Sequence, residues 1–284
     1  MNAASSGTRT PASHNLVRRT ALLLAAALVA ACSSAPPKPS PEAVSQLAPT
    51  GKLRAAINFG NPVLASRDPA SGVPRGVSVD LSRELAARLG VPLEIVPYAA
   101  AGRVVDAVKT GAWDVAYVAR DPLRSADMYQ SPAYVVIEGS YLVPAESPIR
   151  SNAEVDRDGI RIAVGRGSAY DLFLTREIRR AMLVRAPTSP EVVSTMIREN
   201  LEVAAGVRQQ LEADARRTAG VRLLPGRFMV INQAMAVPKG RDAGAAYVHD
   251  FIEEMKASGF VAQSLVRNKV EGAAVAGPDD PKEP

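Results

Sequence analysis

Residues 79–96 read VDLSRELAARLGVPLEIV, and this stretch decides the fold class. Residues 79–89 have the apolar spacing of an amphipathic helix, and Gly90 with Pro92 marks its end. Residues 93–96 form a mostly apolar run that predicts a strand. A helix that stops at a glycine and leads directly into a strand is one unit of an α/β fold.

The same alternation continues in both directions along the chain. Strands expected at 53–57 and 114–118 and a helix at 104–109 complete a β-α-β-α-β run, which indicates a mainly parallel sheet flanked by helices. A second series reads strand 161–164, helix 168–180, strand 182–184, helix 190–199, strand 201–205, helix 207–218 and strand 221–224. We expect closing helices at 243–256 and 260–266.

Two of the expected helices begin with capping signals. Ser168 and Asp171 form a capping-box pattern at the start of the helix 168–180. Ser189 is well placed as the N-cap of the helix 190–199, with Pro190 at the first helical position.

Two long extended segments connect the two series. Residues 134–143 would lead from the first into the second, and 229–237 would lead back. We therefore predict an α/β fold of two lobes, each a mainly parallel sheet flanked by helices, with a ligand cleft between them. Lobe I would comprise residues 51–138 and 231–270, and lobe II residues 139–230.

Residues 1–31 have the features of a secretory signal peptide. Arg18 and Arg19 precede an apolar run that is too short to span a bilayer and ends in small residues. Residues 28–32 read LVAAC and resemble a bacterial lipobox, in which Cys32 is the lipidation site and the first residue of the mature chain. An ordinary signal peptide with a chance cysteine is the alternative.

The two ends of the mature chain have unusual compositions. Residues 32–50 are rich in proline, serine and alanine, so we expect a stiff, extended tether. Residues 271–284 are expected to be a disordered tail. Acyl chains such as palmitate on Cys32 would anchor this lipoprotein to a membrane, in the periplasm or at the cell surface. Ser33 is not acidic, so an outer-membrane location stays open.

Composition excludes several functional classes. The net charge is +5, but residues 1–31 hold three arginines and no acidic residue, so the rest is close to neutral and predicts no nucleic-acid partner. The chain has two histidines and one cysteine. Only His249 lies in the expected mature chain, so a histidine-based catalytic triad or a multi-histidine metal site is almost excluded. We expect no metal and no other cofactor.

Residues 53–270 resemble the bacterial extracellular solute-binding proteins of family 3, the amino-acid type. The segments that carry the resemblance occur in the expected order and read GKLR (51–54), GVSVDL (76–81), GAWDVA (111–116), VGRGSA (164–169) and AMAVPKG (234–240). The resemblance implies the substrate-binding component of an ABC importer rather than an enzyme. Such a receptor, which we expect to be monomeric, closes on a small polar solute and delivers it to permease and ATPase subunits.

The turn 165–169 is the strongest local binding signal. Gly167 lets the backbone approach a ligand, and a helix that starts at Ser168 would direct free N–H groups toward an anion. Arg166 adds a positive charge. The alternative is a plain strand-to-helix turn in which Ser168 only caps its own helix.

The resemblance also implies an arginine that holds the carboxylate of the ligand in a bidentate pair. We assign Arg124 as its counterpart, although Asp121 stands where the family has threonine. The strand-to-arginine spacing is short, so Arg120 is a rival. The alternative is a solvated loop arginine paired with Asp121 or Asp127.

The loop after the first strand and the end of the strand 201–205 complete the candidate site. Asn58 and Asn61 could hydrogen-bond a ligand, and Phe59 could pack on it or belong to the core. The resemblance implies an aspartate for the ammonium of the ligand near Gly206, but that place reads Ala-Gly-Val, and Glu202 comes too early.

The missing acid raises a hypothesis about the ligand. Either the ammonium has another partner, or the ligand has none, because an unpaired buried ammonium is costly. The hypothesis of an anionic ligand, a carboxylate or dicarboxylate, rests on four arginines: Arg120, Arg124, Arg166 and Arg208. Two alternatives to a receptor stay open: an enzyme resembling cyclohexadienyl dehydratases with Glu138 or Glu202 as general acid or base, and a sensory or scaffold protein.

Overall fold

The computed structural model describes residues 1, 3–4 and 38–278. The predicted signal peptide and its lipidation site Cys32 therefore lie outside the described residues, as do residues 279–284. The part from Lys38 onward is one compact unit. Within the described ranges, no helix is long and apolar enough to span a membrane.

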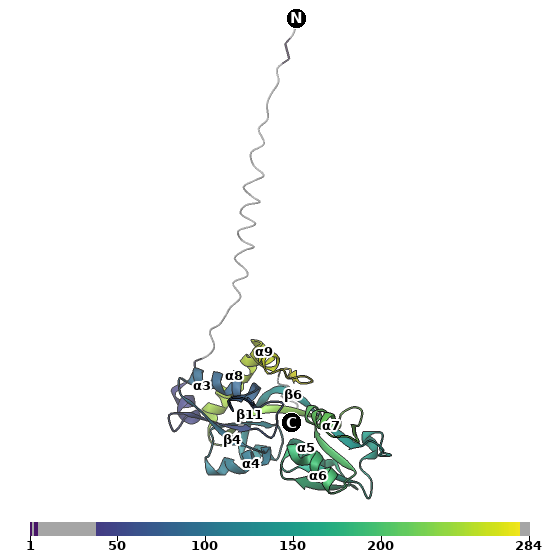
Figure 1. Cartoon of the computed structure of the whole chain (residues 1–284). Helices are drawn as coiled ribbons and strands as arrows, with labels where there is room; N and C mark the ends of the chain where they lie inside the picture. The colour runs from purple at the N-terminus through teal and green to yellow at the C-terminus, as the bar shows by residue number, and fades with distance from the viewer. Residues whose placement is uncertain (2, 5–37, 279–284) are drawn as a thin grey trace. The chain divides into compact units, whose positions relative to one another are not determined.

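A sheet of ten strands forms the centre of the unit (Figure 1). Its main path runs β4 (Leu93–Tyr98), β1 (Leu53–Asn58), β5 (Val115–Ala119), β11 (Met229–Pro238), β6 (Met128–Pro144), β9 (Val203–Val207), β7 (Arg161–Gly165) and β8 (Met182–Ala186). Strands β10 (Val221–Leu223) and β12 (Ala274–Val275) also pair with β6, and β2 (Ser66–Arg67) with β3 (Pro74–Arg75) forms a separate hairpin.

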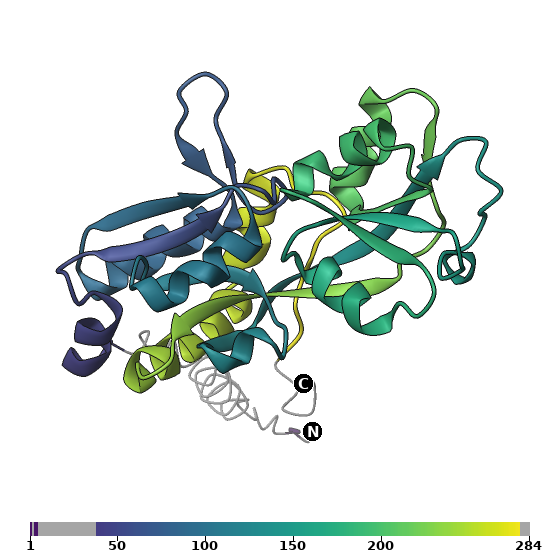
Figure 2. The ribbon, with the colours of Figure 1, turned by 90° about the horizontal axis from the view of Figure 1, so that it is seen from below.

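The sheet has two parallel halves joined by two antiparallel strands. β1 is parallel to β4 and β5, and β7 is parallel to β8 and β9. We call these halves lobe I and lobe II. The strands β6 and β11 run antiparallel between them, as Figure 2 shows. This arrangement confirms the predicted two-lobe α/β class.

Gly139 marks the point on β6 where pairing passes from one lobe to the other. It stands opposite Met229 of β11 and also begins the pairing with β9, opposite Val207. A Cβ atom at this position would lie 2.6 Å from the Met229 side chain and 3.0 Å from Phe228. The close approach of the Met229 and Phe228 side chains therefore favours glycine at this position.

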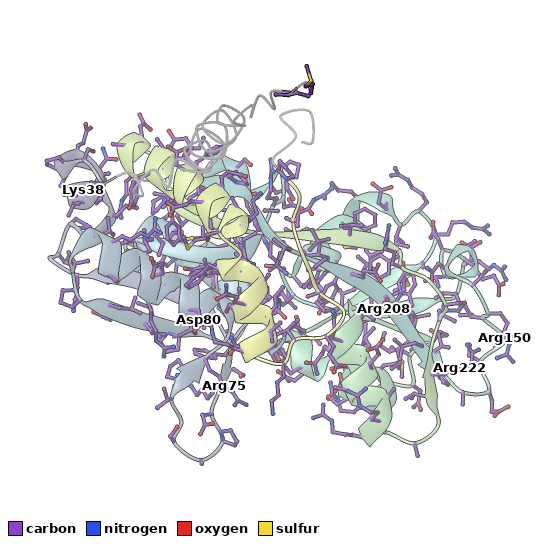
Figure 3. The ribbon with its side chains drawn as sticks, turned by 90° about the horizontal axis from the view of Figure 1, so that it is seen from above. Lys38, Arg75, Asp80, Arg150, Arg208 and Arg222 are labelled. Carbon is purple, nitrogen blue, oxygen red and sulfur yellow. The ribbon has the colours of Figure 1, made fainter. Side chains whose placement is uncertain are left out.

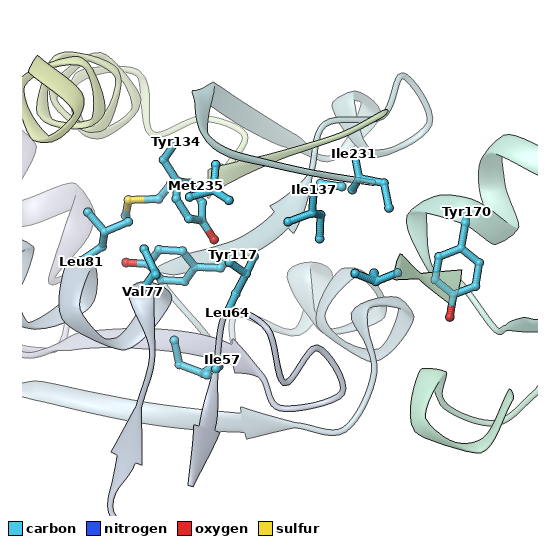
Figure 4. Packing of buried hydrophobic residues seen from close by; sticks show 14 of the residues in the cluster. Ile57, Leu64, Val77, Leu81, Tyr117, Tyr134, Ile137, Tyr170, Ile231 and Met235 are labelled. Carbon is cyan, nitrogen blue, oxygen red and sulfur yellow. The ribbon is translucent and has the colours of Figure 1, made fainter. Parts of the chain in front are cut away.

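Helices cover both lobes. In lobe I these are α2 (Pro41–Leu47), α3 (Val77–Leu89), α4 (Ala101–Asp106), α8 (Asp242–Ala257) and α9 (Phe260–Arg267); in lobe II they are α5 (Ala169–Glu177), α6 (Val192–Arg198) and α7 (Arg208–Arg217). α3 buries Val79, Leu81 and Leu85 in the main core, and Figure 4 labels Leu81 among the packed residues. It ends at Gly90, which is left-handed with φ 68°, as the sequence predicts.

The expected tether contains a packed helix. Ser40 caps α2, Pro41 occupies its first turn, and Leu47 is fully buried against α8. Proline is compatible with the first helical turn, so the proline-rich composition does not exclude a helix here. The expected tail also differs, because β12 pairs with residues 135–136 of β6.

The two predicted caps have different outcomes. The Ser168 hydroxyl accepts the N–H of Asp171 at 3.0 Å, so the predicted cap of α5 is present. The predicted N-cap role of Ser189 is wrong, because Ser189 opens the 3-10 turn Ser189–Glu191 and α6 begins only at Val192. The side chain of Ser189 instead accepts a hydrogen bond from the Tyr170 hydroxyl at 2.8 Å.

Candidate functional site

A cavity of about 50 Å³ lies between the lobes. We call it the interlobe cavity. It lies where β1, β5 and β9 end and where α5 and α7 begin, which is the place that an open α/β sheet offers to a ligand. Its lining includes Asn58, Asn61, Arg124, Ser168, Gly206 and Val207.

Arg124 reaches the cavity from the 3-10 turn Arg124–Ala126 that follows β5, and its residue surface is only 2% exposed. One Nη donates to the carbonyl of Ala119 at 2.7 Å, and the other donates to the carbonyl of Gly167 in lobe II at 3.0 Å. Its Nε–H is buried and finds no partner among the described residues. Burial lowers the pKa of Arg124 to about 10, and the nearby charge of Asp121 only partly opposes this effect. The guanidinium is thus still charged at neutral pH.

Asp121, which replaces the family's threonine, joins the two lobes. Its carboxylate accepts the N–H of Leu123 at 2.9 Å and pairs with Arg176 of α5 at 3.0 Å. The Asp121 side chain is 4% exposed, so the pair is partly shielded from water. A second interlobe contact joins the backbones of Gly167 and Gly102. A Cβ atom added to Gly167 would lie only 2.7 Å from the Cα of Gly102. The lobes are therefore closed on each other.

Tyrosine and serine hydroxyls form much of the remaining polar lining. The hydroxyl of Tyr134 is 3.2 Å from that of Ser78, and Tyr170 donates to Ser189. Tyr117 and Tyr134 meet edge to face with ring centroids 6.0 Å apart. Figure 4 shows these two rings in lobe I and Tyr170 in lobe II. Burial raises the pKa of all three tyrosines, so they act as neutral hydroxyls.

The loop after β1 contributes two of its three predicted residues to the cavity. Asn58 and Asn61 line it, and the side-chain oxygen of Asn61 is buried without a hydrogen-bond partner in the described chain. Phe59 instead packs against the main core, with the Arg67 guanidinium 4.5 Å from its ring centroid. Of the two interpretations of Phe59, core packing fits the structure.

The turn 165–169 and the end of β9 face the cavity from lobe II. Ser168 lines the cavity and also caps α5. Gly167 is not part of the lining, but its carbonyl accepts a hydrogen bond from Arg124, which is part of it. The Arg166 side chain is exposed and lies outside the lining. Gly206 lines the cavity, and a Cβ there would come within 3.1 Å of Leu211.

The structure does not gather the four predicted arginines at one site. Arg120 lies outside the interlobe cavity and lines a separate pocket with Tyr129 and Lys239. Arg208, labelled in Figure 3, donates to Glu138 at 2.8 Å. With Arg166 exposed, Arg124 alone brings a positive charge to the cavity from the described part of the chain.

The two candidate catalytic acids are also placed away from the cavity. Hydrogen bonds from Arg227 and Arg208 lower the pKa of Glu138, and one from Arg161 lowers the pKa of Glu202. Both carboxylates are held ionised in ion pairs, and neither lines the interlobe cavity.

The sequence interpretation missed the tyrosines and two glutamines that line the cavity. Tyr117 and Tyr134 lie on predicted strands, where an aromatic residue most often belongs to the core, and Gln210 and Gln233 carry no motif. Gln210 lies in the first turn of α7, but Tyr134 and Gln233 lie in the middle of β6 and β11, where no sequence signal marks them as cavity residues.

Comparison with known proteins places the chain in a family. Residues 53–267 match the family of bacterial extracellular solute-binding proteins, family 3. No curated protein sequence matched the chain.

Three solved structures share the fold. The solute receptor for L-cysteine of Neisseria gonorrhoeae is 21% identical, with a TM-score of 0.70, and the match covers 81% of this chain and 94% of that one. The P235GK mutant of ArgBP from T. maritima is 20% identical, with a TM-score of 0.69 and coverage of 81% and 100%. The ancestral amino acid-binding protein AncCDT-1, a precursor of cyclohexadienyl dehydratase, is 19% identical, with a TM-score of 0.67 and coverage of 79% and 98%. The fold, the cleft between its lobes and the family match agree, and the chain belongs to the bacterial extracellular solute-binding proteins, family 3.

Proposed function

We propose that the protein is the substrate-binding component of an ABC importer and that it binds a small polar solute in the interlobe cavity. The observation that carries the proposal is the buried Arg124, whose Nε–H has no partner in the described chain. A buried donor of this kind is costly unless a ligand or water occupies it. A ligand carboxylate at this point would meet a planar guanidinium, the geometry that recognises carboxylates best.

Hinge closure would couple binding to a change that an importer can recognise. A ligand in the cavity touches Asn58 and Arg124 from lobe I and Ser168 from lobe II, so its full contacts form only when the lobes are closed. The strands β6 and β11 would act as the hinge, with the boundary between lobes near Gly139. The pairing pattern supports the proposed lobes 51–138 with 231–270 and 139–230.

Membrane attachment belongs to the same proposal. Acylation of Cys32 would hold the receptor at a membrane in the periplasm or at the cell surface, close to permease and ATPase subunits. Because α2 packs on α8, the spacer would be shorter than the sequence suggests and would end near Ser40. Mass spectrometry of the purified membrane fraction tests this step: an unmodified Cys32 would contradict it.

A ligand screen tests the receptor function. The mature chain would be heated with amino acids, hydroxy acids, keto acids and dicarboxylates, and a ligand at 100 times its Kd should stabilise the fold by about 2.7 kcal/mol. We expect a hit that is weakened in Arg124→Lys and kept in Arg166→Lys, whose side chain is outside the cavity. The absence of any hit would contradict the receptor function.

The enzyme alternative has no comparable support. The AncCDT-1 likeness is one of fold. Glu138 and Glu202 are engaged by arginines, and their lowered pKa values make them poor general acids. The receptor function is therefore the one that the geometry favours.

A further inference from the structure

We infer that the ligand is an organic acid with one carboxylate and no ammonium group. The inference rests on the proposed receptor function and specifies its substrate class. It departs from the zwitterionic ligand that an amino-acid receptor would bind, and it depends on the charges around the interlobe cavity.

The described residues that line the interlobe cavity carry a net positive charge. Among the described residues that line it, Arg124 is the only one with a charge. No described carboxylate forms an ion pair with Arg124, and the nearby Asp121 is paired with Arg176 instead. A monoanion would bring the total charge of cavity and ligand to zero. A zwitterion has no net charge, so it would leave one positive charge buried, which is unfavourable.

An ammonium group on the ligand would find no carboxylate among the described residues that line the cavity. Gly206 and Val207 line the cavity where β9 ends and α7 begins, and neither offers a carboxylate. The carbonyls of Ala119 and Gly167 beside the guanidinium already accept hydrogen bonds from Arg124. An ammonium would have to rely on neutral oxygens only, close to an unneutralised arginine.

Two buried polar atoms of residues that line the cavity have no hydrogen-bond partner in the described chain. The Arg124 Nε–H is a donor, which suits a carboxylate oxygen, and the Asn61 oxygen is an acceptor. A hydroxyl on the ligand would satisfy the acceptor without adding charge. The hydroxyls of Tyr117 and Tyr134 can donate or accept, whereas Tyr170 already donates to Ser189 and can only accept. The cavity therefore suits a hydroxy acid best, because a keto oxygen cannot donate to the Asn61 oxygen.

The described lining of the cavity can neutralise one ligand carboxylate, because it holds one cation. A second carboxylate would need a second cation, but Arg120 lies at another pocket, Arg166 is exposed and Arg208 is paired with Glu138. The dicarboxylate suggested by four arginines therefore loses its support, because the fold brings only Arg124 to the cavity.

Isothermal titration of the mature chain tests the inference with matched acids. Each set consists of an α-amino acid and the 2-hydroxy and 2-keto acids with the same side chain, so that only the α-substituent changes. We expect a hydroxy or keto acid to bind roughly tenfold or more tightly than its amino acid, because only the amino acid leaves a buried charge unpaired. An amino acid that binds more tightly would overturn the inference and leave the receptor function standing. No binding in any set would overturn both.

A pair of variants tests the physical cause. Val207 lines the cavity and is the N-cap of α7, a position where Asp and Asn are both favourable. Val207→Asp should weaken the organic acid by about tenfold or more and strengthen the matched amino acid, because it supplies the missing carboxylate. Val207→Asn has nearly the same shape without the charge and should keep the preference for the organic acid. If both variants shift the preference equally, or Val207→Asp does not shift it, the charge argument is wrong.

Discussion

Two arginine sites of lobe I differ in whether a carboxylate of the protein balances the buried charge. At the first, Arg54 and Arg241 both contact Asp114, whose side chain is fully buried. Hydrogen bonding to Asp114 raises the pKa of Arg54. At the second, Arg124 is itself buried without an ion-pair partner in the described chain, and burial lowers its pKa to about 10. The first site is complete within the protein, whereas the second would be completed by the carboxylate of the proposed ligand.

This comparison separates residues that stabilise the fold from residues that bind. Breaking the cluster of Arg54, Arg241 and Asp114 should lower the free energy of unfolding and have little effect on ligand affinity. A substitution of Arg124 should lower ligand affinity more than it lowers the free energy of unfolding. The following experiments test this distinction, from the largest expected effect to the smallest.

Asp114→Asn should destabilise the protein most, by about 3 kcal/mol, because it leaves Arg54 and Arg241 without a counter-charge. Urea denaturation measures the change, and titration should show an unaltered ligand affinity. Asp158→Asn is the matched control, since Asp158 forms an exposed pair with Arg180 and should have no measurable effect. If Asp114→Asn is as stable as Asp158→Asn, the buried carboxylate of Asp114 does not stabilise the fold, and the contrast with Arg124 is lost.

Arg124→Lys should weaken binding of the organic acid by about 30-fold, because lysine keeps the charge but loses the planar fork. The free energy of unfolding should fall by less than in Asp114→Asn. Titration calorimetry measures the affinity, with Arg166→Lys as the exposed control. If both arginine variants bind equally well, Arg124 does not contact the ligand.

Affinity should be constant near neutral pH and fall only at high pH. A bound anion stabilises the protonated guanidinium, whose pKa in the free protein is about 10, so affinity is lost as the pH rises through that value. At pH 11 the affinity should be about tenfold lower than at pH 8. Titration at both pH values measures this, with circular dichroism to verify folding. A loss of affinity below pH 9 would assign the effect to another group.

Arg176→Ala should have the smallest effect, a loss of about fivefold in affinity, because its pair with Asp121 joins the lobes only when they are closed. Stopped-flow kinetics should show faster ligand dissociation. Arg180→Ala removes a comparable arginine of lobe II that pairs within that lobe, and should leave the dissociation rate unchanged. An unchanged rate in Arg176→Ala would show that the pair does not hold the lobes together.

Local patterns predicted most of the fold. Helical spacing with a glycine stop located α3, and the Ser168 and Asp171 pattern located the start of α5, because these signals depend on neighbours in the sequence. α2 was missed because its stability comes from packing on α8, about 200 residues away in the chain, which composition does not reveal. The role of Ser189 likewise depends on Tyr170, a partner in a different helix.

The candidate site was harder to predict because it depends on which charges the fold pairs. The sequence favoured Arg124 over Arg120 as the carboxylate clamp, but it counted Arg166 and Arg208 with them as support for an anionic ligand. In the structure, Glu138 engages Arg208 from a distant strand. Only the three-dimensional structure shows that Arg124 keeps its charge at the cavity without a carboxylate partner among the described residues.

A crystal structure of the mature chain with a bound 2-hydroxy acid tests the central claim most directly. We predict a carboxylate oxygen within hydrogen-bond distance of the Arg124 Nε and the ligand hydroxyl directed toward the Asn61 oxygen. A ligand bound elsewhere, or bound in the interlobe cavity with its carboxylate turned away from Arg124, would contradict the account.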